Sequence, residues 1–173
     1  DAGMLTHAIE HLDIPAKNFA DGPHGIRHEK GENCTSFPNL CCAAATFDTD
    51  LLYEMGEALA KDCVAHDVDM LLGPGINIKR YANCGRNFEY YSEDPVIAGK
   101  FASAVTRGVQ SQKVAVSIKH FACNNKEANR FASDSRLSER ALREIYLKGF
   151  EIAVKEGDPW TIMSSYNLIN GQH

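Results

Sequence analysis

The fold of this chain is decided by one stretch, Val114-Ala-Val-Ser-Ile-Lys-His-Phe-Ala-Cys-Asn-Asn-Lys-Glu-Ala-Asn-Arg130. It begins with a short apolar run, 114–118, whose β-branched content is typical of a strand buried on both faces. Charged side chains follow at once, beginning with Lys119 and His120. Ligands collect at the carboxyl ends of parallel strands in α/β proteins, so the stretch predicts a strand that ends in a binding site. An ordinary polar loop is the alternative.

Length and composition limit what the protein can be. A chain of 173 residues suits one domain, 1–173, that buries a real core. Its apolar content of 44% and charged content of 24% are ordinary for a soluble globular protein. A net charge of -5, without a Lys/Arg-rich run, argues against nucleic acid as a partner. No apolar stretch approaches a membrane span and no signal-peptide pattern opens the chain, so no membrane partner is expected.

The cysteines, at positions 34, 41, 42, 63, 84 and 123, form no CxxC pair. Three of them lie in apolar contexts, which favours reduced, buried thiols over disulfides or a zinc site. We therefore expect a cytoplasmic protein that uses neither a metal nor another cofactor.

Strand patterns alternate with helix patterns along the chain. The predicted strands are 14–20, 68–72, 114–118 and 160–166. The predicted helices run over 48–66, from Asp94-Pro95 onward, and over 138–155, with Asp48, Asp94 and Ser138 as N-caps. The third helix has a predicted inner face of Leu142, Ile145, Tyr146, Gly149 and Ala153. Residues 1–12 have helical spacing and are expected to be the tail of another helix, whereas 28–45 have no clear period and are expected to be a loop.

Alternation of strands and helices predicts right-handed βαβ units with a parallel sheet. The expected fold class is α/β, and a partial (β/α)8 TIM-like barrel is one form of it. A complete barrel needs roughly 200 residues or more, so this chain would supply about half of one. An open doubly wound sheet also fits the order, but neither GxGxxG nor GxxxxGK[ST] occurs, which leaves a nucleotide-binding version without support.

The strand ends, taken together, resemble a known family. The motifs are Asp-Gly-Pro-His-Gly-Ile-Arg (21–27), Leu-Gly-Pro-Gly-Ile-Asn-Ile-Lys-Arg (72–80), Gly-Arg-Asn-Phe-Glu-Tyr-Tyr-Ser-Glu-Asp-Pro (85–95), Ile-Lys-His-Phe-Ala-Cys-Asn-Asn-Lys-Glu-Ala-Asn-Arg (118–130) and Met-Ser-Ser-Tyr-Asn-Leu-Ile-Asn-Gly (163–171). In this order they resemble the signatures of glycoside hydrolase family 3 β-glucosidases, over nearly the whole chain. The resemblance implies the N-terminal, TIM-like barrel domain of such an enzyme.

The resemblance also implies which residues bind the substrate. By motif position, the residues lining the glycone subsite are Asp21, Arg27, Arg86, Lys119, His120, Arg130 and Tyr166. These types suit a pyranose, because a carboxylate accepts from hydroxyls while Lys, His and Arg donate to them. Other roles stay open: Arg27 or Arg86 could tie down its own loop by pairing with Asp21 or Glu89, and Tyr166 could be an aromatic wall.

The function implied by the resemblance is hydrolysis of terminal non-reducing β-linked sugars with a retaining mechanism. In the family, the nucleophile is an aspartate after the next strand and the acid/base is usually a glutamate of a later domain. Neither lies in this chain, so no catalytic residue is assigned here and the isolated chain is expected to be inactive. The alternatives are a non-catalytic sugar-binding half barrel, a β-xylosidase-type member of the family, or a heteromeric enzyme.

Two structural expectations follow for the site. The loops 21–27, 73–94, 119–137 and 166–173 should open on one face. Neighbouring strand residues point to opposite sides, so Lys119 and His120 can share a pocket only if the backbone is distorted or cis. The expected partners are a β-linked glucoside or short oligosaccharide, and either remaining segments of the same enzyme or a self-associated copy, because the strand edge 160–165 would otherwise be exposed.

Overall fold

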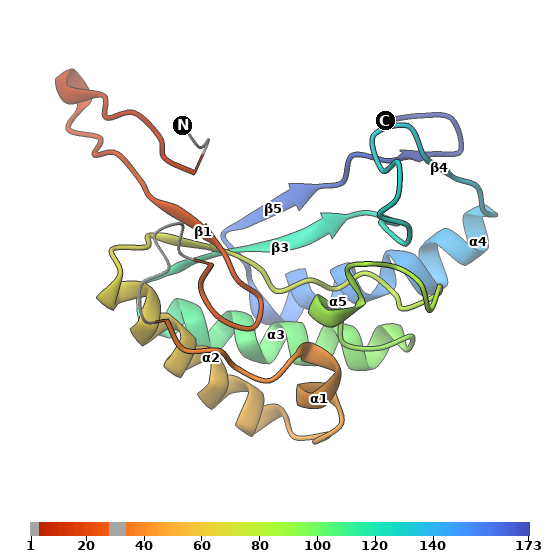
Figure 1. Cartoon of the computed structure of the whole chain (residues 1–173), viewed down its shortest axis with the longest axis horizontal. Coiled ribbons are helices and arrows are strands. Elements are labelled where there is room, and N and C mark those ends of the chain that lie inside the picture. Colours follow the sequence, from red (N-terminus) through yellow and green to blue (C-terminus); the bar gives the residue numbers. More distant parts are fainter. Residues whose placement is uncertain (1–3, 28–33) are drawn as a thin grey trace.

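The computed structural model describes residues 4–27 and 34–173. Its centre is a four-stranded sheet in the order β1-β2-β3-β5, and all three pairings are parallel (Figure 1). The strands are β1 (Phe19–Asp21), β2 (Met70–Leu72), β3 (Ala115–Phe121) and β5 (Thr161–Ser164). Neighbours in this sheet follow one another in sequence order, as the βαβ pattern predicted.

The long helices cover one face of the sheet (Figure 1). They are α2 (Thr49–Ala65), α3 (Pro95–Ser111) and α5 (Lys148–Gly157), and α3 packs between the other two. A doubly wound sheet carries helices on both faces, whereas a barrel carries them only outside. The one-sided layer therefore confirms an α/β fold that forms part of a (β/α)8 barrel.

All three predicted N-caps are confirmed. The Asp48 carboxylate accepts from the first-turn amides of α2, and the Asp94 carboxylate does so for α3, where Pro95 occupies the first helical position. The Ser138 hydroxyl accepts from the amide of Ala141. These caps fix where each helix begins and therefore how long each strand-to-helix loop is.

The core lies between the sheet and the helices. Residues 115–120 of β3 are all buried, as expected for a central strand with both faces covered. Helices α2 and α3 approach closely at Gly56 and Gly108. A Cβ atom on Gly108 would lie 2.2 Å from the carbonyl oxygen of Tyr53, so a side chain at this crossing would force the helices apart.

The N-terminal helix predicted over 1–12 is wrong for its described part. Residues 4–18 form an antiparallel arm that projects from the sheet, in which the amide of Thr6 donates to the carbonyl of Lys17 at 2.9 Å (Figure 1). Its only helical turn is the 3-10 segment η1 (Glu10–Leu12). The apolar side chains of this arm are exposed, so no packing surface stabilises a helix. The strand expected from residue 14 begins only at Phe19, and residues 1–3 lie outside the described part.

The helix predicted over 138–155 is interrupted. A short α4 (Glu139–Ala141) runs into a π-helical turn, η3 (Leu142–Tyr146), before α5 begins. The amide of Leu147 donates to the carbonyl of Leu142 at 2.8 Å, five residues back in the chain. This wider turn rotates the side chains, and Ile145, predicted on the inner face, is 39% exposed.

Several short elements lie where loops were expected. Helix α1 (Leu40–Ala44) falls within the predicted loop 28–45, and Asn39 caps it by accepting from the amide of Cys42. Strands β4 (Asp134–Ser135) and β6 (Leu168–Ile169) pair in parallel beyond the end of the main sheet. Residues 28–33 of the predicted loop lie outside the described residues.

Cys63, Cys84 and Cys123 are buried, and burial raises the pKa of the Cys63 and Cys123 thiols to about 12. Within the described part of the chain, no helix combines the length and the apolar character that crossing a membrane requires.

Candidate functional site

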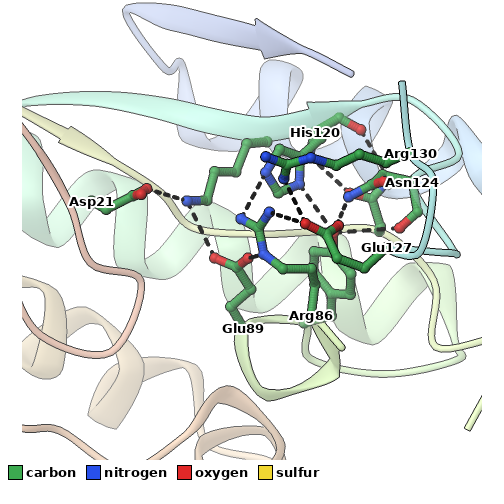
Figure 2. A network of polar contacts seen from close by, with 10 residues as sticks. Asp21, Arg86, Glu89, His120, Asn124, Glu127 and Arg130 are labelled. Carbon is green, nitrogen blue, oxygen red and sulfur yellow. Dashed lines mark hydrogen bonds and ion pairs between the residues drawn. The ribbon is translucent and has the colours of Figure 1, made fainter. Parts of the chain in front are cut away.

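A polar cluster lies at the carboxyl end of the parallel strands (Figure 2). Lys119 Nζ lies 2.7 Å from Asp21 Oδ1, so the ends of β3 and β1 meet on one face as predicted. The contacts continue from Lys119 through the loop after β2 and the loop after β3. We call this set the polar cluster, and its members are Asp21, Arg86, Glu89, Lys119, His120, Glu127 and Arg130.

Lys119 is shared between two carboxylates. Its ammonium contacts Asp21 Oδ1 at 2.7 Å and Glu89 Oε2 at 3.2 Å. The side chains of Lys119 and Glu89 are 1% and 2% exposed, whereas that of Asp21 is 35% exposed. Asp21 is therefore the most exposed member of this trio.

Arg86 joins the two loops of the cluster. Its Nε donates to Glu89, its Nη1 lies 3.3 Å from Glu127 Oε1, and its Nη2 lies 3.0 Å from His120 Nε2. Burial by itself lowers the pKa of Arg86, but the charge and hydrogen bond of Glu89, with smaller contributions from Tyr90 and Glu127, outweigh it and raise the pKa. The pairing of Arg86 with Glu89, one of the alternatives open from sequence, is thus present.

His120 is a neutral imidazole with a defined tautomer. Burial, followed by the charges of Arg86, Lys119 and Arg130, lowers the pKa of His120 to about 2. Arginine has no acceptor atom, so Nε2 accepts from Arg86 and the remaining proton lies on Nδ1. Nδ1 then donates to the hydroxyl of Tyr90 at 3.0 Å. Both ring nitrogens therefore have protein partners.

The backbone at the end of β3 turns both Lys119 and His120 into the cluster. The peptide bonds Lys119–His120 and Phe121–Ala122 are cis, and the pairing register with β5 shifts between Ile118 and Phe121. Asn77 holds this segment, since its Oδ1 accepts from the amide of His120 at 2.8 Å and its Nδ2 donates to the His120 carbonyl at 2.9 Å. The predicted cis peptide is confirmed.

Arg130 extends the cluster onto an aromatic pair. Its Nη1 donates to Glu127 Oε1 at 2.6 Å, and its guanidinium carbon lies 5.2 Å from the ring centre of Phe131 and 5.0 Å from that of Tyr166. The two rings are 4.5 Å apart between centroids. Tyr166 is 55% exposed and forms a wall beside the polar groups.

Arg27 is the predicted site residue that the structure does not join to the cluster. It is exposed, and its backbone amide donates to the carbonyl oxygen of Asp21 at 2.7 Å. Among the described residues no ion pair links its guanidinium to Asp21. The other six predicted residues are connected by the contacts above.

Sequence reasoning missed several buried groups that support the site. Asn77 and Tyr90 hold His120 on two sides, and Asn124 donates to the Tyr90 hydroxyl at 3.0 Å. The sequence offered one clue to Asn77, because it closely follows Gly73-Pro74-Gly75, which ends a predicted strand. No group of three or more His, Cys, Asp or Glu side chains within residues 4–27 and 34–173 is arranged to hold a metal ion.

Comparisons with known proteins agree with this architecture. Residues 3–173 match the family model described as the glycosyl hydrolase family 3 N terminal domain. Thermostable beta-glucosidase B of Acetivibrio thermocellus is 44% identical over 97% of this chain, and an exo-alpha-(1->6)-L-arabinopyranosidase of Bifidobacterium longum is 45% identical over 95%. The chain covers 24% and 23% of these two relatives, about a quarter of their length.

A solved structure is similar in the same region. Beta-glucosidase 3B of Thermotoga neapolitana, in complex with α-D-glucose, superposes with a TM-score of 0.92 at 50% identity. That match covers 98% of this chain and 25% of the other. Sequence, fold and motif order therefore agree, and this chain belongs to glycosyl hydrolase family 3.

Proposed function

We propose that the protein carrying this chain hydrolyses terminal, non-reducing β-linked sugars with retention of configuration, as a β-glucosidase does. Residues 1–173 would supply the loops that bind the non-reducing sugar. The observation that carries this proposal is the Lys119 ammonium shared between buried Glu89 and the accessible carboxylate of Asp21. The names of the relatives, β-glucosidases and an arabinopyranosidase, support a glycoside as substrate.

The cluster suits the hydroxyl groups of a pyranose. An ammonium has three N–H groups, and Lys119 uses two of them on carboxylates, which leaves one for a sugar oxygen. The partly exposed carboxylate of Asp21 can accept from adjacent hydroxyls. A hydroxyl that reached His120 would have to replace Arg86 as the partner of Nε2. Arg27 and Tyr166 would line the rim.

We place the catalytic carboxylates outside residues 1–173. A retaining glycosidase needs two carboxyl groups about 5 Å apart on either side of the bond that breaks. Glu89 is buried behind Lys119 and Arg86, and Glu127 binds Arg86 and Arg130, so both are committed to cations of the cluster. The isolated chain would therefore bind sugar weakly and not hydrolyse glycosides.

An α-L-arabinopyranoside is the second candidate substrate, favoured by the arabinopyranosidase relative at 45% identity. L-Arabinopyranose lacks the exocyclic hydroxymethyl group of glucose. The two sugars would therefore be distinguished by the wall of the pocket that faces this group. A β-xyloside tests the same feature with another pentose.

We also propose a cytoplasmic location, which the buried Cys63, Cys84 and Cys123 support.

The test is a substrate panel on the whole natural protein. Nitrophenyl β-D-glucoside, β-D-xyloside and α-L-arabinopyranoside are compared by kcat/KM, beside the variant Lys119→Met and the isolated chain. We expect the β-glucoside to be the best substrate, Lys119→Met to lose roughly a hundred-fold or more, and the isolated chain to be inactive. Preference for the arabinopyranoside would establish the second candidate. Sugar binding without any turnover would favour a non-catalytic binding protein.

A further inference from the structure

We propose that Glu89 is a positioning residue for the sugar: it holds Lys119 and Arg86 in place and thereby keeps the carboxylate of Asp21 open to substrate. This inference rests on the proposed function, because it assigns a role within the same pocket. Nothing in the motif resemblance gave Glu89 a place in the subsite. Its role follows from where its two oxygens lie (Figure 2).

Each oxygen of Glu89 binds a different cation. Oε2 lies 3.2 Å from Lys119 Nζ, and Oε1 accepts from Arg86 Nε. The residue is 1% exposed and both of its oxygens are occupied by cations, so it offers no free acceptor to a ligand. A buried carboxylate of this kind can affect a bound sugar only through the two cations that it holds.

The backbone that carries Glu89 is held in place. Glu89 ends the 3-10 turn η2 (Asn87–Glu89), where its amide donates to the carbonyl of Arg86 at 3.1 Å. Asn87 Nδ2 donates to the carbonyl of Tyr81 at 2.9 Å and so ties this turn to the loop before it. A Cβ atom on Gly75 would lie 2.4 Å from the carbonyl oxygen of Glu89, so the segment after β2 packs directly against the turn. The turn is therefore held from two sides.

The consequence concerns Asp21. Lys119 has Asp21 and Glu89 as its carboxylate partners, and Asp21 is the exposed one. Lys119 already contacts Oδ1 of Asp21. If Glu89 no longer attracts the ammonium, Lys119 can move further onto the Asp21 carboxylate, and fewer acceptor positions remain for a sugar hydroxyl. Arg86 would also lose the partner that orients its Nε, and with it the geometry of the bond from Nη2 to His120.

Charge balance points the same way. The carboxylates of Asp21, Glu89 and Glu127 face the cations of Lys119, Arg86 and Arg130, while His120 is neutral. Removing the negative charge of Glu89 leaves an excess of positive charge inside the pocket, and the remaining cations then compete for Asp21 and Glu127.

The test uses Glu89→Gln in the whole natural protein. Glutamine keeps the shape, but its oxygen can take only one of the two positions that face Arg86 and Lys119, and its NH2 group, a donor, then faces the other cation. We expect KM for nitrophenyl β-D-glucoside and the inhibition constant for glucose to rise together, roughly ten- to a hundred-fold, because both report contacts with the non-reducing sugar. Glu89→Asp keeps the negative charge on a shorter side chain. We expect it to raise both constants by a smaller factor than Glu89→Gln does. Glu57→Gln, on the outer helix α2, is the matched control and should leave both constants unchanged.

A double-mutant cycle separates positioning from general damage to the fold. If Glu89 acts through Lys119, Glu89→Gln raises KM and the glucose inhibition constant by a much smaller factor in the Lys119→Met background than in the wild type. Equal losses in both backgrounds, or unchanged KM and glucose inhibition in Glu89→Gln, would overturn the inference while wild-type activity upholds the proposed function. A wild-type protein that neither hydrolyses the glucoside nor binds glucose would instead reject the proposed function itself.

Discussion

Lys119 Nζ lies 2.7 Å from Asp21 Oδ1, although the two residues are 98 positions apart in the chain. The contact exists because β1 and β3 flank β2 in parallel, so their carboxyl ends reach the same face. It is the longest-range of the ion pairs in the polar cluster, and it connects the first loop of the domain to the central strand.

Removing the buried ammonium should destabilise the end of β3. Lys119→Met leaves Glu89 with one cation fewer in a site where both side chains are at most 2% exposed. Breaking a buried ion pair by deleting one partner costs about 3–5 kcal/mol. Hydrogen exchange of the peptide 114–121, followed by mass spectrometry, measures the opening free energy of this strand. The double variant Lys119→Met/Glu89→Gln should lose less opening free energy than the two single variants lose together. Full additivity would argue against an interaction between Lys119 and Glu89.

Lowering the pH should destabilise the end of β3, because His120 is buried there as a neutral imidazole. The folded-state pKa of His120, about 2, lies below the value of about 6.5 for an unfolded chain. Between these values the unfolded chain binds more protons, so stability falls as pH falls below about 6.5, by up to about 1.4 kcal/mol per pH unit. Exchange of peptide 114–125, corrected for intrinsic rates, should therefore accelerate on acidification. His120→Asn should remove most of this pH dependence, whereas replacing the exposed His7 should not.

The close crossing of α2 and α3 should not tolerate a side chain. Gly108→Ala gains helix propensity of about 1 kcal/mol, but the added Cβ would lie 2.2 Å from the Tyr53 carbonyl oxygen. Overpacking of this kind costs about 1–3 kcal/mol, so the midpoint of thermal unfolding should fall. Gly85→Ala is the control, because its nearest neighbour would be 3.7 Å away. Equal midpoints for the two variants would contradict the packing described here.

The edge strand β5 should make the isolated chain self-associate. Trp160 and Ile162 are 56% and 46% exposed at this edge of the sheet. An uncovered apolar edge invites pairing with another chain, and a charge on it discourages pairing. Light scattering of the isolated chain should show oligomers, and Ile162→Lys should shift them toward monomer. A monodisperse monomer of the unmodified chain would refute this prediction.

Local chemistry was enough to predict most of the barrel segment. The caps Asp48, Asp94 and Ser138 act within one turn of the helix they start, so sequence alone identifies them. The cis peptide at Lys119–His120 met the expectation of a distorted or cis backbone, which arose because the family resemblance assigns both adjacent side chains to one pocket. The fold class then followed from the order of elements.

The errors came from features that depend on distant packing. The arm over 4–18 has helical spacing, but its apolar side chains have no surface to pack against in the described structure. The π-helical turn at Leu142–Tyr146 shifts Ile145 outward, and no residue pattern announces such a turn. In the site, Asn77 was missed because its partner, the backbone of His120, lies 43 positions away. The role of Glu89 appeared only when its burial between two cations was known.

The most direct test of this sugar site is a crystal structure of the whole natural protein with bound glucose. We expect the sugar at the polar cluster, with hydroxyl oxygens within about 3 Å of Lys119 Nζ and of the Asp21 carboxylate, and with Glu89 still in contact with Lys119. Glucose bound elsewhere, or bound at the cluster without contact to either Asp21 or Lys119, would show that the polar cluster is not the sugar site.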